Sequence, residues 1–186
     1  PELETLLKFV PDGSVLDGEI IAWNGKKPLD FNILQKRIGR KKVSKSLIET
    51  APVIFIAYDL LEFEGMDIRN QNLELRRSKL AKLTNQIPND LPIKFSAEIR
   101  SKTWTELTRI REASRSQKAE GIMLKNKNSE YYSGRKKGDW WKWKLDPLTI
   151  DGVLIYAQAG HGRRANLYTD YTFAIWDDDQ LVPFTK

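Results

Sequence analysis

The sequence contains no cysteine and a single histidine, His161, among its 186 residues. Without cysteine there are no disulfide bonds and no thiolate-held metals, and one histidine is too few for the usual zinc sites. Any bound metal is therefore expected to be a hard cation held by oxygen atoms. No apolar run reaches the ~20 residues that a membrane-spanning helix needs, and no basic-then-apolar leader opens the chain. We therefore expect no membrane association and no export.

Basic residues are abundant and clustered. Lysine and arginine total 31 against 25 acidic residues, which gives a net charge of +6. They gather at residues 36–42, 135–137 and 163–164. A run of charge is usually a solvated face, but three clusters, one of them beside three tryptophans, favour a polyanionic partner such as nucleic acid. With 186 residues the chain can hold one medium domain, or one domain and part of another. Hydrophobic residues make up 40% of it, which is ordinary for a globular protein.

The hydrophobic pattern predicts a mixture of helices and strands. Thr103 and Glu106 fit a capping box, which predicts a helix that buries Trp104, Leu107 and Ile110. Pro147 marks a plausible boundary between a region of residues 1–147 and a second of 148–186. Helices are expected at 2–9, 31–38, 43–49, 73–84 and from 103, and strands at 15–23, 53–61, 93–99, two within 118–146, and 149–158, 171–176 and 181–185. The last three predict the opening strands of a β-meander.

Residues 140–145 alternate between residue types. Successive side chains of a strand point to opposite faces, so Lys142 and Lys144 would share one face, with Trp141 and Trp143 on the other. Their Cα atoms would lie roughly 6.5–7 Å apart, twice the rise per residue of a strand. Fixed positive charges at that spacing suit a polyphosphate. The alternative is a buried strand whose lysines extend into solvent.

Two carboxylates flank a glycine in Asp17-Gly18-Glu19. On a strand Asp17 and Glu19 would share a face, and the glycine between them would leave room for a ligand to approach. This pattern suits a sugar hydroxyl or a magnesium ion. A solvent-facing acidic edge is equally consistent with it.

Tyr58 and Asp59 lie within the apolar segment 53–61. The tyrosine ring could stack on a nucleobase, although a core tyrosine is the commoner arrangement. Asp59 is expected to have a positive or hydrogen-bonding partner, because an unpaired buried carboxylate is costly. Glu120 and Lys125 have opposite parity on an ideal strand, so facing one ligand together requires a bend, which residues 119–121 could provide.

Four of these stretches, in this order, resemble the successive motifs of ATP-dependent DNA ligases, members of the covalent nucleotidyltransferases. They are Asp17-Gly-Glu19, Ala57-Tyr-Asp-Leu60, Glu120-Gly-Ile-Met-Leu-Lys125 and Trp140-Trp-Lys-Trp-Lys144. The resemblance covers roughly residues 11–186. It implies an α+β fold, with a nucleotidyltransferase (adenylation) core of antiparallel sheets and flanking helices in residues 1–147. The first strands of an OB-fold β-barrel would follow in residues 148–186.

The resemblance also implies a three-step reaction. A lysine attacks the α-phosphate of ATP, AMP passes to the 5′-phosphate at a nick in double-stranded DNA, and a 3′-hydroxyl displaces it. Glu19 would contact the ribose or the metal, and Tyr58 would stack on adenine. Glu120 would help to hold Mg²⁺, and the α-phosphate charge would be neutralised by Lys125, Lys142 and Lys144.

The resemblance further implies a monomeric enzyme of the bacterial cytoplasm that acts on the nucleoid in replication, repair or recombination. Two alternatives remain open: an RNA ligase or mRNA capping enzyme of the same superfamily, and a non-catalytic nucleic-acid-binding module. The sequence departs from the family pattern in one respect. The family's nucleophile lies in a Lys-x-Asp-Gly motif several dozen residues before Asp-Gly-Glu, and none of the 16 residues before Asp17 forms it. We therefore expect an internal segment of a ligase that forms no lysyl-AMP by itself.

Overall fold

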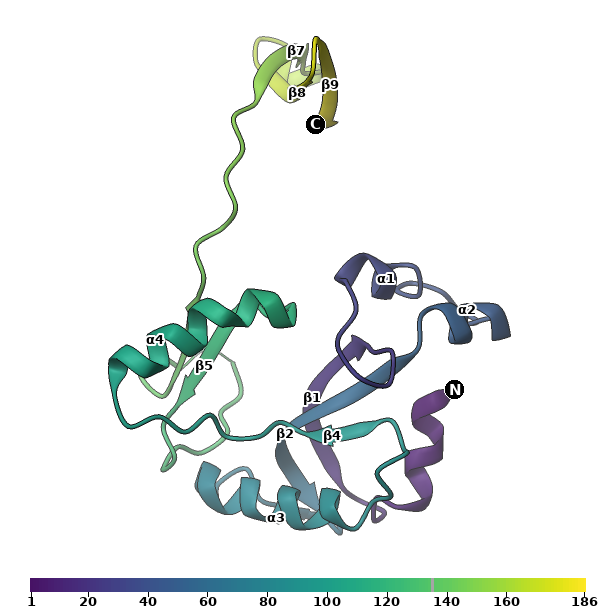
Figure 1. Cartoon of the computed structure of the whole chain (residues 1–186), viewed down its shortest axis with the longest axis vertical. Helices are drawn as coiled ribbons and strands as arrows, with labels where there is room; N and C mark the ends of the chain where they lie inside the picture. The colour runs from purple at the N-terminus through teal and green to yellow at the C-terminus, as the bar shows by residue number, and fades with distance from the viewer. Residues whose placement is uncertain (135) are drawn as a thin grey trace. The chain divides into compact units, whose positions relative to one another are not determined.

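The computed structural model describes residues 1–134 and 136–186, so Arg135 of the second basic cluster lies outside the described residues. The chain forms two compact units, Pro1–Leu145 and Asp146–Lys186. Figure 1 shows helices beside the sheets of the first unit and strands in the second. Among the described residues, no helix is long and apolar enough to cross a membrane.

The central strand of the first unit is β2 (Val53–Phe63), the apolar and β-branched segment of the sequence. It pairs antiparallel with β1 (Val15–Ala22) and β3 (Met66–Asp67), and parallel with β4 (Ile93–Phe95). The strand predicted to reach residue 99 thus ends at Phe95. Just beyond this end, the Ser96 amide donates a backbone hydrogen bond to the Ala57 carbonyl of β2.

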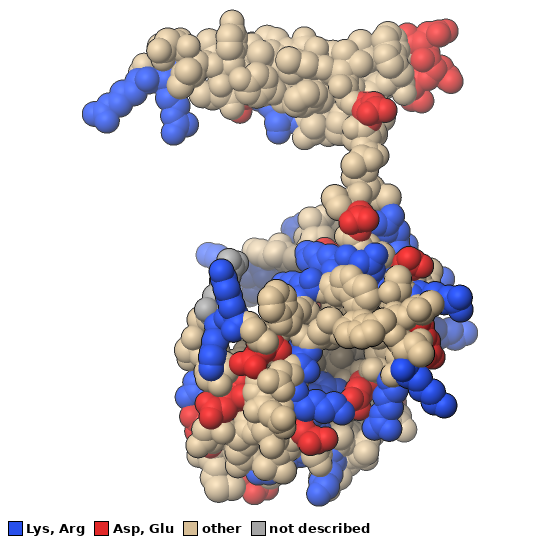
Figure 2. Space-filling model, turned by 90° about the vertical axis from the view of Figure 1, so that its left-hand side faces the viewer, with Lys and Arg blue, Asp and Glu red and all other residues tan. Residues whose placement is uncertain are grey.

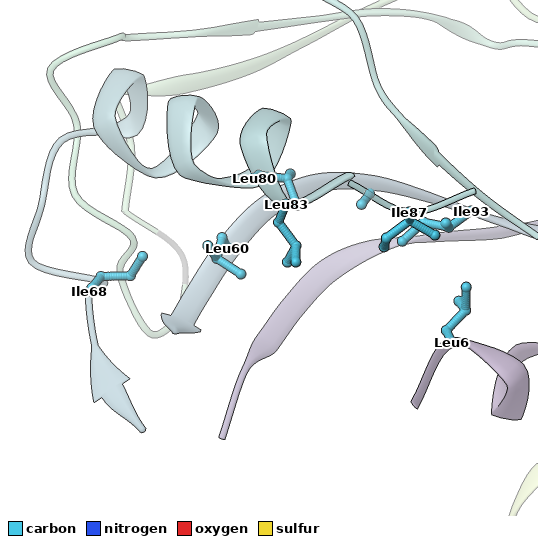
Figure 3. Packing of buried hydrophobic residues seen from close by; sticks show 8 residues of the cluster. Leu6, Leu60, Ile68, Leu80, Leu83, Ile87 and Ile93 are labelled. Carbon is cyan, nitrogen blue, oxygen red and sulfur yellow. The ribbon is translucent and has the colours of Figure 1, made fainter. Parts of the chain in front are cut away.

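Helix α3 (Leu73–Asn85) covers one face of this sheet (Figure 1). It begins where the Asn72 side chain accepts a hydrogen bond from the Leu75 amide, which satisfies one of the free amides of the first turn. The apolar stripe of the helix, which includes Leu80 and Leu83, is buried. Figure 3 shows part of the resulting core, which consists of Leu6, Ala57, Leu60, Ile68, Leu80, Leu83, Ile87 and Ile93.

Three short helices lie near the N-terminal end of the first unit: the 3₁₀ helix η1 (Glu2–Lys8), α1 (Phe31–Gln35) and α2 (Lys45–Thr50). Helix α1 ends before the predicted residue 38. It ends at Gln35 with Lys36 as its C-cap. The guanidinium of the next residue, Arg37, donates to both carboxylate oxygens of Glu2 at 2.6 and 2.7 Å and to the Ala51 carbonyl at 2.7 Å. This arginine fixes the α1–α2 segment against η1.

The remaining elements of the first unit are α4 (Trp104–Ala113), η2 (Ser114–Gln117) and a two-stranded antiparallel sheet of β5 (Gly121–Lys125) and β6 (Trp140–Lys144). The predicted cap is present, since Thr103 Oγ1 accepts from the Glu106 amide. The return bond to the Glu106 carboxylate comes from the Lys102 amide instead of that of Thr103. The predicted burial of Trp104 is wrong, because this side chain is 70% exposed.

The second unit is an antiparallel meander of β7 (Val153–Ala159), β8 (Tyr168–Asp177) and β9 (Gln180–Thr185). The 3₁₀ helix η3 (Gly162–Arg164) lies between the first two strands. Ala174 is the buried side chain of the meander, while most of its large apolar residues are exposed. The expected strands are therefore present, although β7 begins later than the predicted residue 149.

Candidate nucleotide-binding site

An irregularity in the β1–β2 pairing changes the position of Tyr58. Asp17 lies opposite Asp59 and Gly18 opposite Ala57, so Tyr58 has no direct partner on β1. A bulge of this kind re-aims a side chain. The Tyr58 hydroxyl donates to Asp17 Oδ1 at 3.1 Å. The hydroxyl of Tyr131, from the β5–β6 connection, donates to Asp17 Oδ2 at 2.8 Å. Asp17 thus holds one aromatic side chain with each carboxylate oxygen.

Both tyrosines remain neutral donors at ordinary pH. Burial and then the Asp17 charge raise the pKa of Tyr58 well above its usual value. Burial and the hydrogen bond to Asp17 raise the pKa of Tyr131 to about 12. Asp17 was noted in the sequence only as a partner of Glu19, and its role toward Tyr131 has no signature in the local sequence.

Gly18 has a different function from the one predicted. A Cβ atom at this position would lie 2.4 Å from Cζ of Phe55 and 2.5 Å from the Ile56 carbonyl oxygen. The space beside Gly18 is therefore filled by the neighbouring strand, and it is not an approach for a ligand.

Lys125, at the end of β5, lies among aromatic rings. Its Nζ is 3.8 Å from the ring centroid of Trp140 and 4.4 Å from that of Tyr58. Tyr131 packs edge-to-face on Trp140 with ring centroids 5.5 Å apart. Burial lowers the pKa of Lys125 to about 8. We call Asp17, Tyr58, Lys125, Tyr131 and Trp140 the aromatic cluster; it joins β1 and β2 to β5 and β6.

The register of β5 and β6 places the other two predicted lysines on the same side. Lys125 pairs with Trp140, Met123 with Lys142 and Gly121 with Lys144. Directly paired side chains and those two residues apart share a face, so Lys142 and Lys144 continue the face of the aromatic cluster. Figure 2 shows lysine and arginine side chains over much of one face of this unit, with acidic side chains among them.

The opposite face of the small sheet packs in part against α4. Trp143 meets Trp104 edge-to-face at 6.0 Å, and the Arg111 guanidinium lies 4.9 Å from the Trp143 ring centroid. Trp141, which the alternation placed on the same apolar face, is 59% exposed. The strand therefore has one face toward the aromatic cluster and another that α4 covers only in part.

Glu120 reaches the lysine row despite its opposite parity. The chain bends there, since Gly121 has φ +142°, a conformation that favours glycine. A Cβ atom at Gly121 would lie 2.3 Å from the Trp143 carbonyl oxygen. Glu120 Oε2 accepts from Lys144 Nζ at 2.6 Å, and this bond lowers the pKa of the Glu120 carboxyl. The bend expected at residues 119–121 is thus confirmed.

Asp59 has the partner that its burial required. Arg76 of α3 forms a bidentate ion pair with it, and both side chains are fully buried. Arg76 was missed in the sequence, although a signal was present. It follows Leu73 by three residues and precedes Leu80 and Leu83 on the same apolar stripe, so an arginine there needs a buried acid.

The two carboxylates predicted to hold a metal come from different segments, Glu19 from β1 and Glu120 from the residue before β5. Glu19 is exposed on β1, and its charge contributes to the raised pKa of Tyr58. The part of the chain that the structure describes contains no group of three or more acidic or histidine side chains able to hold an ion. Mg²⁺ commonly takes one or two carboxylates together with substrate phosphates. The exposed, ionised Glu120 beside the lysine row fits that pattern.

Comparison with known proteins identifies the family. The model of the ATP dependent DNA ligase domain matches residues 1–144. The chain belongs to this ligase family. A "Probable DNA ligase" of Koribacter versatilis is 32% identical over 206 residues, which cover 100% of this chain and 36% of that protein. A "DNA ligase" of Methanospirillum hungatei is 27% identical, covering 100% of this chain and 33% of that protein. The ligase chain thus spans about a third of the length of these relatives.

Solved structures show the same fold. The mycobacterial DNA ligase D complexed with ATP and MES has a TM-score of 0.59 at 24% identity, covering 98% of this chain and 53% of that one. A structure of Lig E DNA ligases has a TM-score of 0.60 at 18% identity, covering 92% and 74%. The predicted family is therefore confirmed. So is the α+β fold, a ligase adenylation core with OB-fold strands.

Proposed function

We propose that the chain supplies the nucleotide-binding part of an ATP-dependent DNA ligase, which seals nicks through a lysyl-AMP and a DNA-adenylate intermediate. The observation that carries this proposal is the convergence at the aromatic cluster. Tyr58 from β2 and Lys125 from β5 meet there, and Lys142 and Lys144 continue the same face. An aromatic surface beside a row of cations matches a nucleobase joined to a chain of phosphates.

The base would stack on Tyr58, whose ring is held by Asp17. Base–aromatic stacking contributes about 1–3 kcal/mol, whereas a cation over an aromatic ring contributes roughly 0.5–2 kcal/mol. A base can therefore displace the ammonium of Lys125 from the Tyr58 ring. The released ammonium then remains close enough to pair with phosphate oxygen.

Lys142 and Lys144 would neutralise charge at the α-phosphate. Phosphoryl transfer is catalysed mainly by positioning and by fixed positive charge. Lys144 is paired with Glu120. The nucleotide must therefore separate this pair or bind beside it.

Mg²⁺ would be held by Glu120, together with phosphate oxygens, and by Glu19 of β1. The ion would supply Lewis-acid neutralisation of the phosphate charge. The sequence contains no Lys-x-Asp-Gly motif, so we propose that the 186 residues alone bind ATP without forming a covalent adenylate.

Nicked double-stranded DNA is the proposed substrate, acted on by a monomer at the bacterial nucleoid. The relatives named above are DNA ligases by name, which favours DNA over an RNA ligase or capping function. The net charge of +6 supports contact with the phosphate backbone. A non-catalytic nucleic-acid-binding module would show salt-dependent DNA binding without an effect of ATP.

The test is calorimetric titration of the chain with ATP and magnesium, compared with GTP. We expect saturable ATP binding that is weakened at least tenfold by Tyr58→Ala and unchanged by Lys82→Ala, an exposed residue of α3. Absence of ATP binding by the unaltered chain, or equal binding by the Tyr58→Ala variant, would overturn the assignment.

Nick sealing is tested in a fusion in which this chain replaces the matching residues of the Koribacter versatilis relative. We expect ATP-dependent sealing of nicked DNA, with no activity on nicked RNA. A folded fusion that seals nicked RNA instead would favour the alternative function.

A further inference from the structure

A buried ion pair links the strand that carries Tyr58 to helix α3. Arg76 Nε lies 2.8 Å from Asp59 Oδ1, and Nη2 lies 2.9 Å from Oδ2. Both side chains are fully buried. Asp59 follows Tyr58 directly, so this pair fixes the backbone immediately beside the proposed adenine-stacking ring.

The third nitrogen of the same guanidinium reaches the connection between β5 and β6. Arg76 Nη1 donates to the Ser129 carbonyl at 3.1 Å and to the Gln71 carbonyl. The Ser129 hydroxyl oxygen in turn accepts from Trp140 Nε1 at 3.2 Å. The guanidinium carbon of Arg76 also lies 5.9 Å from the ring centroid of Tyr131. One side chain thus contacts β2 directly and is joined through Ser129 to the start of β6.

The neighbouring arginine supports the same strand. Arg77 Nη1 donates to the Tyr58 carbonyl at 2.9 Å, and its Nη2 donates to the Ser96 carbonyl beyond β4. Two consecutive residues of α3 therefore bind two consecutive residues of β2. The backbone of Tyr58 is held from the helix side, while its hydroxyl is held by Asp17.

Stability alone does not require this arrangement. Replacing a buried ion pair with apolar side chains of similar volume is often neutral or stabilising. Contacts between apolar side chains, however, do not fix the orientation of the two partners. The planar guanidinium has donors at fixed angles, and here they determine how far β2 lies from the β5–β6 connection.

We propose that Arg76 is a positioning residue of the ligase site, which sets the spacing between Tyr58 and the side chains of Lys125 and Trp140. This inference rests on the proposed nucleotide function. Arg76 is fully buried, so it acts through its contacts with Asp59 and Ser129. A lysine at position 76 keeps the positive charge but cannot reach both partners with a planar fork.

The first readout is the indole N–H spectrum of the ¹⁵N-labelled 186-residue chain, which has six tryptophans. Arg76→Lys should shift the Trp140 resonance, because the Trp140 indole donates to Ser129. The resonance of Trp176, in the second unit, should not move. Lys82→Ala, on the exposed side of the same helix, should leave all six resonances in place. An unmoved Trp140 resonance in Arg76→Lys would overturn the proposal.

The second readout is ATP affinity. We expect Arg76→Lys to weaken ATP binding at least tenfold while Lys82→Ala leaves it within twofold. If the unaltered chain binds no ATP, the proposed nucleotide function fails, although a shifted Trp140 resonance would still establish the link through Ser129. Normal ATP affinity in Arg76→Lys refutes the positioning role alone.

A double variant separates an effect on positioning from an effect on folding. Asp59→Leu with Arg76→Met removes both buried charges together and should unfold as cooperatively as the unaltered chain. We expect it to bind ATP at least tenfold more weakly, because two packed apolar side chains no longer fix the distance between Tyr58 and the side chains of Lys125 and Trp140. Unchanged affinity in this folded double variant would show that Arg76 serves stability only.

Discussion

Replacing Asp17 with Asn is expected to destabilise the first unit measurably. The two carboxylate oxygens accept hydrogen bonds from Tyr58 and Tyr131 at 3.1 and 2.8 Å. An asparagine side chain has one accepting oxygen, and its amide nitrogen cannot accept. One hydroxyl therefore loses its acceptor, and the other exchanges a charged acceptor for a neutral one. Because a hydrogen bond to a charged group contributes about 1.5–3 kcal/mol, we expect a loss of about 2 kcal/mol.

Urea unfolding followed by tryptophan fluorescence measures this loss. Trp176 is the one tryptophan of six outside the unit that contains Asp17, so the signal reports mainly on that unit. Asp12→Asn, at an exposed acidic position, is the matched control and should change stability by less than about 0.5 kcal/mol.

The effects of Asp17→Asn and Tyr131→Phe should be less than additive, because both changes remove the same hydrogen bond. Strict additivity, or a loss below about 0.5 kcal/mol for Asp17→Asn, would refute the reasoning. The tyrosines would then be held by packing, and Asp17 would be incidental.

Three further predictions concern the lysines and the bend. In the fusion with the Koribacter versatilis relative, Lys142→Ala or Lys144→Ala should slow adenylation at least ~100-fold, the scale expected when one preorganised charge is lost. ATP affinity of the unaltered chain should fall as pH rises through about 8, because Lys125, with its pKa lowered to about 8, then loses the charge that attracts phosphate. In Lys125→Arg the profile should be flat, because arginine stays charged. Gly121→Ala should cost more than about 2 kcal/mol in urea unfolding, because the left-handed conformation is strained for alanine and the Trp143 carbonyl occupies the space.

Each of these predictions has a contradicting result. Near-normal adenylation in both lysine variants would remove the lysine row from the catalytic site. A pH profile that is equally steep in Lys125→Arg would assign the titration to another group. A Gly121→Ala variant as stable as the unaltered chain would mean that the bend can relax without the glycine.

Features with a local cause were predictable from the sequence. The apolar stripe of α3 and the central strand follow from hydrophobic periodicity, and the cap at Thr103 follows from the residue type at the start of a helix. The need for a partner at Asp59 also followed, since a buried charge must be compensated. The identity of that partner did not, because Arg76 is brought to Asp59 only by packing of the helix on the sheet.

Features that depend on long-range geometry were missed or misinterpreted. Tyr131 contacts Asp17 across 114 positions of the chain, and no local pattern encodes such a contact. Trp104 was expected on the buried face of the helix with Leu107 and Ile110, yet it is exposed at the start of α4. The space beside Gly18 was assigned to a ligand. The Phe55 ring that fills it is placed there by the pairing of two strands, which the local sequence does not reveal.

The occupied space beside Gly18 has a consequence for how this sequence can change over evolutionary time. The ring of Phe55 and the backbone carbonyl of Ile56 together occupy the place that a side chain would need at this residue, far earlier in the chain. A smaller residue at position 55 would remove the ring but leave the carbonyl, so a methyl group at position 18 would still clash with backbone. In a broad collection of homologous genes we therefore expect glycine at 18 to persist even where the residue at 55 is small.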